Sequence, residues 1–267
     1  MRQVGGVHCR VVSCTPPWRF EDCSTAPATD NRTRDHNSDR LPQAYTPITA
    51  RYIALGENGS VLGASVYGEI ATAGGTAQRY QDGRISYTSA TGARETVGPV
   101  AARYVAVGAE AGRLGFPVTS PIALAGGGTA SRFQNGRISW SATTGAWETV
   151  GPIAREYERL DAETGVLGYP LTGDLAADRG RATRFENGRI SWSASTGAHA
   201  TTGAIGERYA QLGAEGGTLG FPIGDQTVDR DSPFKRFGLP PGGRQEFEGG
   251  TLSHERRTGV VVMTPRA

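Results

Sequence analysis

Leu114-Gly115-Phe116-Pro117 is the stretch that decides the fold, because the chain repeats it at a nearly constant interval. Its Leu-Gly pair recurs every 52 or 53 residues, at Leu62-Gly63, Leu114-Gly115, Leu167-Gly168 and Leu219-Gly220. A second stretch, Asn135-Gly136-Arg137-Ile138-Ser139-Trp140, keeps the same period and returns in related form at residues 82–87 and 187–192. Two independent stretches with one period predict a tandem array of four units.

Each unit begins with a helix pattern, which is clearest over residues 99–108. Proline suits the first helical position and glycine suits the stop, while Val100, Tyr104 and Val107 fall on one helix face. Asn135-Gly136 between apolar residues is typical of a tight hairpin whose turn needs positive φ. We therefore expect an α+β fold. Each unit would hold a short helix, a Leu-Gly-Phe-Pro turn and a small three-stranded antiparallel β-meander, in a ring-like or propeller-like array.

The composition along the chain predicts two parts. Residues 1–45 are expected to be a disordered leader, because the polar segment 24–40 has almost nothing to bury. Residues 46–267 form the expected repeat domain, with units at about 46–98, 99–151, 152–203 and 204–262. The end units have each lost part of the pattern, as terminal repeats often do.

Several functional classes are disfavoured by composition. The net charge of +2 comes from scattered charges without the dense basic stripe of a nucleic-acid binder, and no apolar run reaches the ~20 residues that span a bilayer. Cys9, Cys14 and Cys23 cannot all pair within one chain and lack CxxC spacing. Residues 1–25 contain no continuous apolar stretch of a signal peptide, so the protein stays inside, its start lies elsewhere, or the chain is a fragment.

No catalytic constellation is visible, so we expect a protein that is not an enzyme and that uses no cofactor or metal. HExxH, GxSxG and P-loop patterns are absent from the sequence. The fourth unit holds the only candidate cluster: Asp225, Asp229, Asp231 and His254. We interpret it as a solvated acidic loop, because a calcium loop would need a glycine and a distal glutamate that are missing here.

Arginines and aromatics that recur with the repeat are the candidate ligand-binding residues. Arg84, Arg137 and Arg189 sit beside the hairpin turn, where forked donors could bind sugar hydroxyls, uronates or phosphates; the alternative is a structural pair with a carbonyl or carboxylate. Arg79, Arg132 and Arg184 precede the turn and carry the same two interpretations.

The recurring aromatics Tyr87, Trp140 and Trp192 could stack on sugar rings, although they share a strand face with buried-type isoleucines, which favours a core role. Trp147 occurs only in the second unit, and we expect it to be exposed. The aromatic of the Leu-Gly-Phe-Pro turn is expected to fill the seam between units.

The chain resembles the LGFP repeat family over roughly residues 46–262, through three copies of Leu-Gly-Phe/Tyr-Pro at a fixed period. The resemblance implies a secreted actinobacterial envelope protein, extracellular or wall-associated, whose repeats attach to cell-wall glycan such as arabinogalactan or peptidoglycan. Such arrays normally accompany a catalytic domain, and none is visible here. The leading hypothesis is a non-catalytic carbohydrate-binding module with multivalent sites. The alternatives are a structural or protein-interaction scaffold, or a truncated part of a larger envelope hydrolase.

Overall fold

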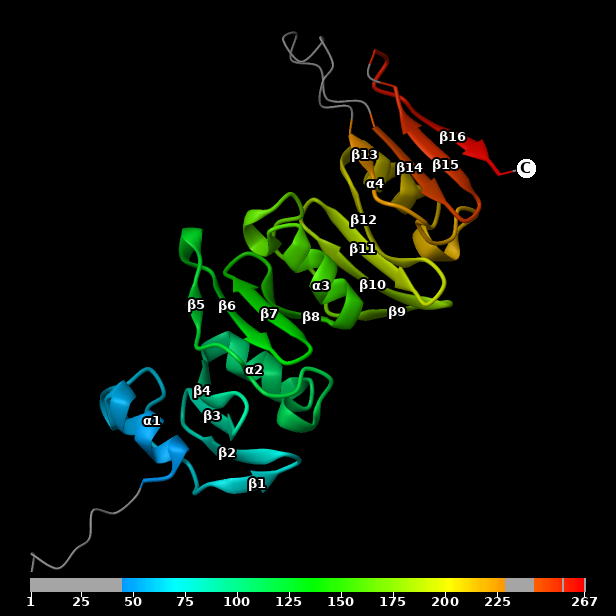
Figure 1. The fold of residues 1–267 in the computed structure, drawn as a ribbon. Helices are drawn as coiled ribbons and strands as arrows, with labels where there is room; N and C mark the ends of the chain where they lie inside the picture. The colour runs from blue at the N-terminus through cyan, green and yellow to red at the C-terminus, as the bar shows by residue number, and fades with distance from the viewer. Residues whose placement is uncertain (1–44, 229–242, 256, 267) are drawn as a thin grey trace, which may run out of the picture. The chain divides into compact units, whose positions relative to one another are not determined.

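The structure is a computed structural model that describes residues 45–228, 243–255 and 257–266 (Figure 1). The described residues belong to one compact unit that begins at Tyr45. Apart from Tyr45, the predicted leader of residues 1–45 lies outside the described residues, as do the three cysteines, Asp229 and Asp231.

A helix of nine residues begins each of the four repeat units. These helices are α1 (Pro47–Leu55), α2 (Gly98–Ala106), α3 (Gly151–Arg159) and α4 (Gly203–Gln211). A short 3-10 helix follows each one: η1 (Glu57–Gly59), η2 (Ala109–Ala111), η4 (Ala162–Thr164) and η5 (Ala214–Gly216). The predicted stop at Gly108 is confirmed, because its φ of 100° lies in the left-handed region that favours glycine.

Four small antiparallel sheets follow the helices, one per unit, and in each sheet the strands pair in sequence order. The first sheet contains β1 (Ile70–Thr72), β2 (Gly75–Arg79), β3 (Gly83–Thr88) and β4 (Gly92–Val97). The second contains β5 (Ile122–Ala123), β6 (Thr129–Phe133), β7 (Gly136–Ser141) and β8 (Gly145–Val150). The third contains β9 (Leu175–Ala177), β10 (Gly180–Phe185), β11 (Gly188–Ser193) and β12 (Gly197–Thr202). The fourth contains β13 (Thr227–Val228), β14 (Gly243–Phe247), β15 (Gly250–His254) and β16 (Val261–Pro265).

The α+β repeat is confirmed, but each meander has four strands where the sequence predicted three. The additional strand is the first of each sheet and is only two or three residues long, so it carries no alternating pattern to detect. In the second unit, η3 (Ala125–Gly127) occupies the connection between this strand and the next.

The hairpin predicted at Asn135-Gly136 exists, but its turn lies one residue earlier. Phe133 pairs with Gly136, which leaves Gln134 and Asn135 in the turn. Gly136 is the first residue of β7 and does not have positive φ. Glycine is required there because a Cβ would collide with the Thr149 carbonyl oxygen of the neighbouring strand.

Each unit has its own hydrophobic core between its helix and its sheet. In the second unit, Tyr104 of α2 lies against Phe133 of β6, with ring centroids 4.7 Å apart. The Tyr104 hydroxyl donates a 2.8 Å hydrogen bond to the carbonyl of Gly115, whose φ of 69° makes the Leu-Gly-Phe-Pro turn. The equivalent tyrosine of every unit makes the same bond: Tyr52, Tyr157 and Tyr209.

Replacing Tyr157 with phenylalanine should therefore destabilise the third unit without leaving a cavity in its core. The variant keeps the ring contact with Phe185 but leaves the Gly168 carbonyl without its hydroxyl donor. Losing one partner of a buried hydrogen bond costs about 1–3 kcal/mol. Urea denaturation followed by tryptophan fluorescence measures this loss, and an unchanged free energy of unfolding would show that the turn does not depend on the bond.

Neighbouring units are joined because each of the first three sheets packs its second face on the helix of the following unit. The structure places α2 against β3 and β4, α3 against β7 and β8, and α4 against β11 and β12 (Figure 1). The predicted aromatic seam is confirmed: a Cβ added to Gly75 would lie 2.9 Å from the Phe116 ring of the next unit. Tyr169 and Phe221 approach Gly128 and Gly180 in the same way. Closure into a ring or propeller stays a prediction.

Candidate binding surface at the unit junctions

The recurring arginines beside the hairpin turn lie in ion pairs between units. Arg84 donates two hydrogen bonds of 2.6 Å to Glu110, which belongs to η2 of the following unit. Arg137 donates bonds of 2.6 and 2.5 Å to Glu163 of η4. The third pair is looser, with 3.1 Å between the Arg189 Nε and a Glu215 oxygen.

A serine on the same strand completes each of these sets, which we call clamps. The clamps are Arg84, Ser86 and Glu110; Arg137, Ser139 and Glu163; and Arg189, Ser191 and Glu215. In the second clamp the side chains of Arg137 and Glu163 are only 9% and 2% exposed. Of the two roles that the sequence left open for these arginines, the structure shows the pair with a carboxylate: their forked donors are directed at a glutamate of the next unit. These arginines therefore hold neighbouring units together.

The recurring aromatics lie half-buried against the core of their own units. Tyr87, Trp140 and Trp192 pack on the first, second and third cores. The sequence predicted that Trp147 is exposed, and this prediction is wrong, because Trp147 is also half-buried. Its Nε1 donates a 2.7 Å hydrogen bond to the Thr144 carbonyl, and the Arg103 guanidinium lies 4.7 Å from its ring centroid. Their placement favours packing over sugar stacking.

A groove opens at three unit junctions, between the hairpin turn of one unit and the helix of the next. The first, second and third grooves have volumes of about 310, 330 and 570 Å³. Equivalent residues line all three: Arg79, Arg132 and Arg184 before the turn, and Asp82, Asn135 and Asn187 within it. The repeat therefore presents one type of groove three times.

The groove arginines differ in their partners. Arg132 donates hydrogen bonds of 2.8 and 2.7 Å to Glu158 of α3, which closes an ion pair across the second groove. Arg79 shares its groove with Val105 at the equivalent helix position, and Arg184 shares its groove with Ala210. Within the part of the chain that the structure describes, these two guanidinium groups have no ion pair or hydrogen bond. The first and third grooves therefore keep their arginine donors available.

An ion pair near the first junction links α1 to β4, and a hydrogen bond from the same arginine reaches the next unit. Arg51 of α1 donates hydrogen bonds of 2.8 and 2.9 Å to Glu95 of β4, and one of 3.0 Å to Ser120. Arg103 and Glu148 form the equivalent pair in the second unit, 2.6 Å apart.

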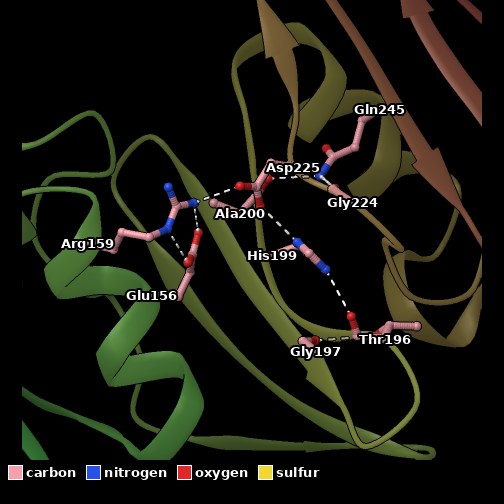
Figure 2. A network of polar contacts seen from close by, with 9 residues as sticks. All are labelled: Glu156, Arg159, Thr196, Gly197, His199, Ala200, Gly224, Asp225 and Gln245. Atoms are coloured by element: carbon pink, nitrogen blue, oxygen red, sulfur yellow. Dashed lines mark hydrogen bonds and ion pairs between the residues drawn. The ribbon is translucent and has the colours of Figure 1, made fainter.

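The third unit replaces this pair with the polar network of Figure 2. Glu156 binds Arg159 at 2.6 Å, and Arg159 also contacts Asp225 of the fourth unit at 2.9 Å. Asp225 lies 2.8 Å from the Nδ1 of His199, whose Nε2 lies 2.9 Å from the Thr196 carbonyl oxygen. Asp225, a member of the acidic cluster in the sequence, thus helps to hold two units together.

Comparison with known families rests on the same repeat. The family described as the LGFP repeat matches residues 62–112, 114–165 and 167–217, which together make up more than half of the chain. The chain belongs to the LGFP repeat family. No curated protein matches it. LGFP repeats occur in cell-envelope proteins. Within the described residues, no helix of this LGFP array has the length and apolar character needed to cross a membrane.

Sequence reasoning missed the glutamates of the clamps, although the LGFP sequence carries a signal for them. Glu110 and Glu163 each follow their arginine by 26 residues, and Glu215 recurs at the corresponding position of the next unit. A glutamate that keeps the period of an arginine indicates a partner, whereas a ligand-binding arginine needs no such companion. The grooves were also missed, because their walls come from two different units.

The Arg51–Glu95 pair should make the first unit sensitive to acid. Burial alone would raise the pKa of Glu95, but hydrogen bonds from Arg51 and the backbone, with the Arg51 charge, outweigh it and hold this pKa below its usual 4.5. A lowered pKa adds stability above about pH 4.5, and that contribution is lost as the pH falls through the folded-state value. Urea denaturation from pH 7 to pH 2 should show the wild-type advantage over Glu95→Gln shrinking below pH 4.5. An advantage independent of pH would contradict the ion pair.

Proposed function

We propose that this LGFP array is a non-catalytic module that binds cell-envelope polysaccharide, such as arabinogalactan or peptidoglycan, at an extracellular or wall-associated location. The observation that carries the proposal is the threefold recurrence of one groove at the unit junctions. A repeating polymer can occupy several equivalent sites, and linked weak contacts add up to a much higher avidity. The proposal needs only neighbouring units in contact, and closure of the array into a ring or propeller remains an extension of it.

The proposed contacts are the arginines before the turn and not those of the clamps, although Arg84 and Arg189 also line the first and third grooves. Arg79, Arg132 and Arg184 are exposed at the surface, and the one ion pair among them, Arg132–Glu158, is itself exposed to solvent. The clamp arginines instead lie in pairs that are largely removed from water. The planar guanidinium presents several donors in a fixed geometry, which suits pairs of sugar oxygens. Asn135 and Asn187 add amide donors and acceptors in the neighbouring turn positions.

Co-sedimentation of the full chain with insoluble wall fractions tests this function. We expect retention at low salt by an arabinogalactan-containing fraction or by purified peptidoglycan. Replacing Arg79, Arg132 and Arg184 together with alanine should reduce retention. A matched control replaces Arg244, Arg257 and Arg266 with alanine. These three arginines are exposed in the fourth unit outside the grooves, and their replacement removes the same charge. No retention of the wild type by either fraction, or equal losses from the two triple variants, would contradict the proposal.

A purely structural scaffold is the competing function, and the clamps are the observation that favours it. Three buried or nearly buried ion pairs between units would suit a rigid spacer or a surface for a protein partner. A scaffold predicts that wall retention is absent while the fold is intact. The same co-sedimentation experiment therefore separates the two functions.

A further inference from the structure

The groove at the third junction differs from the other two in the size of its helix residues. Gly206 of α4 stands where the other grooves have Ala101 and Ala154. One turn further along the helix, Ala210 stands where they have Val105 and Glu158. Both changes remove side-chain atoms from the groove wall, which accounts for a volume of about 570 Å³ against about 310 and 330 Å³. This volume lies within the usual range for small-ligand sites.

The third groove also has polar side chains that no other residue engages. Arg184, Asn187 and Glu207 line it and are exposed. None of the three side chains makes a hydrogen bond or ion pair with the residues described in this structure. In the second groove, by contrast, the equivalent Arg132 is closed onto Glu158. The third groove therefore offers a cation, an amide and a carboxylate together.

The balance of charge in this groove selects a class of ligand. Four charged side chains line it: Arg184, Arg189, Glu186 and Glu207. Arg189 is already paired with Glu215, so a uronate or phosphate that approached Arg184 would also meet two carboxylates. Sugar hydroxyls both donate and accept hydrogen bonds, so a neutral sugar can bind the guanidinium, the amide and the carboxylates at once. Val166, which is 58% exposed, adds an apolar surface for the C–H groups of a sugar ring.

We propose that the third groove is the principal saccharide site of the array, that it takes a neutral, polyhydroxylated sugar, and that Gly206 sets its depth. This inference rests on the proposed function. It narrows the ligand from envelope polysaccharide in general to uncharged sugar units, and it makes the three junctions unequal. The first and second grooves then act as weaker contacts along the same chain of sugars.

Gly206→Ala tests the depth of the groove in a variant that should fold. A Cβ at Gly206 would lie 3.1 Å from the Thr201 carbonyl oxygen, a tight contact, but alanine already occupies this helix position at Ala101 and Ala154. The matched control is Gly224→Ala, in the same unit and with nothing within 4 Å of the added Cβ. Filling a pocket that fits its ligand closely should weaken binding about tenfold.

The probes are a neutral oligogalactan and an oligogalacturonate of equal length, titrated into the full chain by calorimetry. The wild type should bind the neutral probe more tightly, with little change in Kd when salt is added, whereas Gly206→Ala should lose most of this affinity and Gly224→Ala should keep it. If Gly206→Ala does not fold, as judged by circular dichroism, Ala210→Val narrows the same groove with the residue found at Val105.

Tighter, salt-sensitive binding of the oligogalacturonate would overturn the neutral-sugar assignment. Neutral-probe affinity that survives in the folded groove-filling variant would overturn the assignment of the site. Failure of the wild type to bind the neutral probe would overturn the inference as well. In each case, retention of the wild type by wall fractions would leave the proposed function standing, so the two failures are distinguishable.

Discussion

Replacing Glu163 with glutamine should destabilise the array by about 3–5 kcal/mol, the usual cost of leaving one member of a buried ion pair without its counter-charge. Glutamine keeps the shape of the side chain but not the negative charge that Arg137 requires. The pair is almost completely removed from water, with 9% and 2% of the two side chains exposed. Because the clamp joins β7 of the second unit to η4 of the third, the loss should fall on the contact between units.

Glu158→Gln is the matched control for this prediction. Arg132 and Glu158 also join the second and third units, but their side chains are 50% and 30% exposed. Water and salt screen such a pair, so its loss should cost about 0–1 kcal/mol. Guanidinium denaturation of the two variants measures the difference. Equal losses would mean that burial does not distinguish the clamp from a surface ion pair.

Gly180→Ala should be the most damaging small substitution at a seam. A Cβ at Gly180 would overlap the Trp192 carbonyl oxygen and lie 2.8 Å from two carbons of the Phe221 ring. Neither neighbour can yield easily, because one is backbone and the other is a ring buried at 0% exposure. Overpacking of this kind costs about 1–3 kcal/mol, and occasionally more. We expect the upper part of this range.

The consequence should be a less cooperative array, because units in a repeat protein depend on contacts with their neighbours. Thermal unfolding of Gly180→Ala should broaden or divide into two transitions as the fourth unit separates from the third. Gly216→Ala is the control, since its Cβ would meet nothing within 4 Å and its φ is not in the left-handed region. A single unfolding transition for Gly180→Ala, as sharp as that of the wild type, would contradict the role assigned to the aromatic seam.

Local features of the fold could be predicted because their causes lie within a few residues. The left-handed stop at Gly108, just after α2, and the left-handed turn at Gly115 follow from the conformational freedom of glycine. The face made by Val100, Tyr104 and Val107 follows from helical periodicity, and all three residues pack on the second core. Two-residue strands such as β5 escaped detection because two residues cannot show a period.

Features shared by two units were harder to predict. The sequence places Arg137 on a strand face opposite the core, which correctly excludes it from its own core. That face, however, meets the next unit rather than solvent, and Glu163 lies 26 residues away. The same difficulty applies to the grooves. Gly206 is an unremarkable helix residue until the structure shows that it forms the wall opposite Arg184.

Hydrogen exchange of the full chain with and without a soluble wall polysaccharide tests the central claim most directly. If the unit junctions bind the polymer, protection should appear in the turn segments 79–84, 132–137 and 184–189 and at the starts of α2, α3 and α4. It should be strongest at the third junction, where the groove is largest. Protection confined to other surfaces of the sheets, or the absence of protection under conditions where the polymer is bound, would contradict the account.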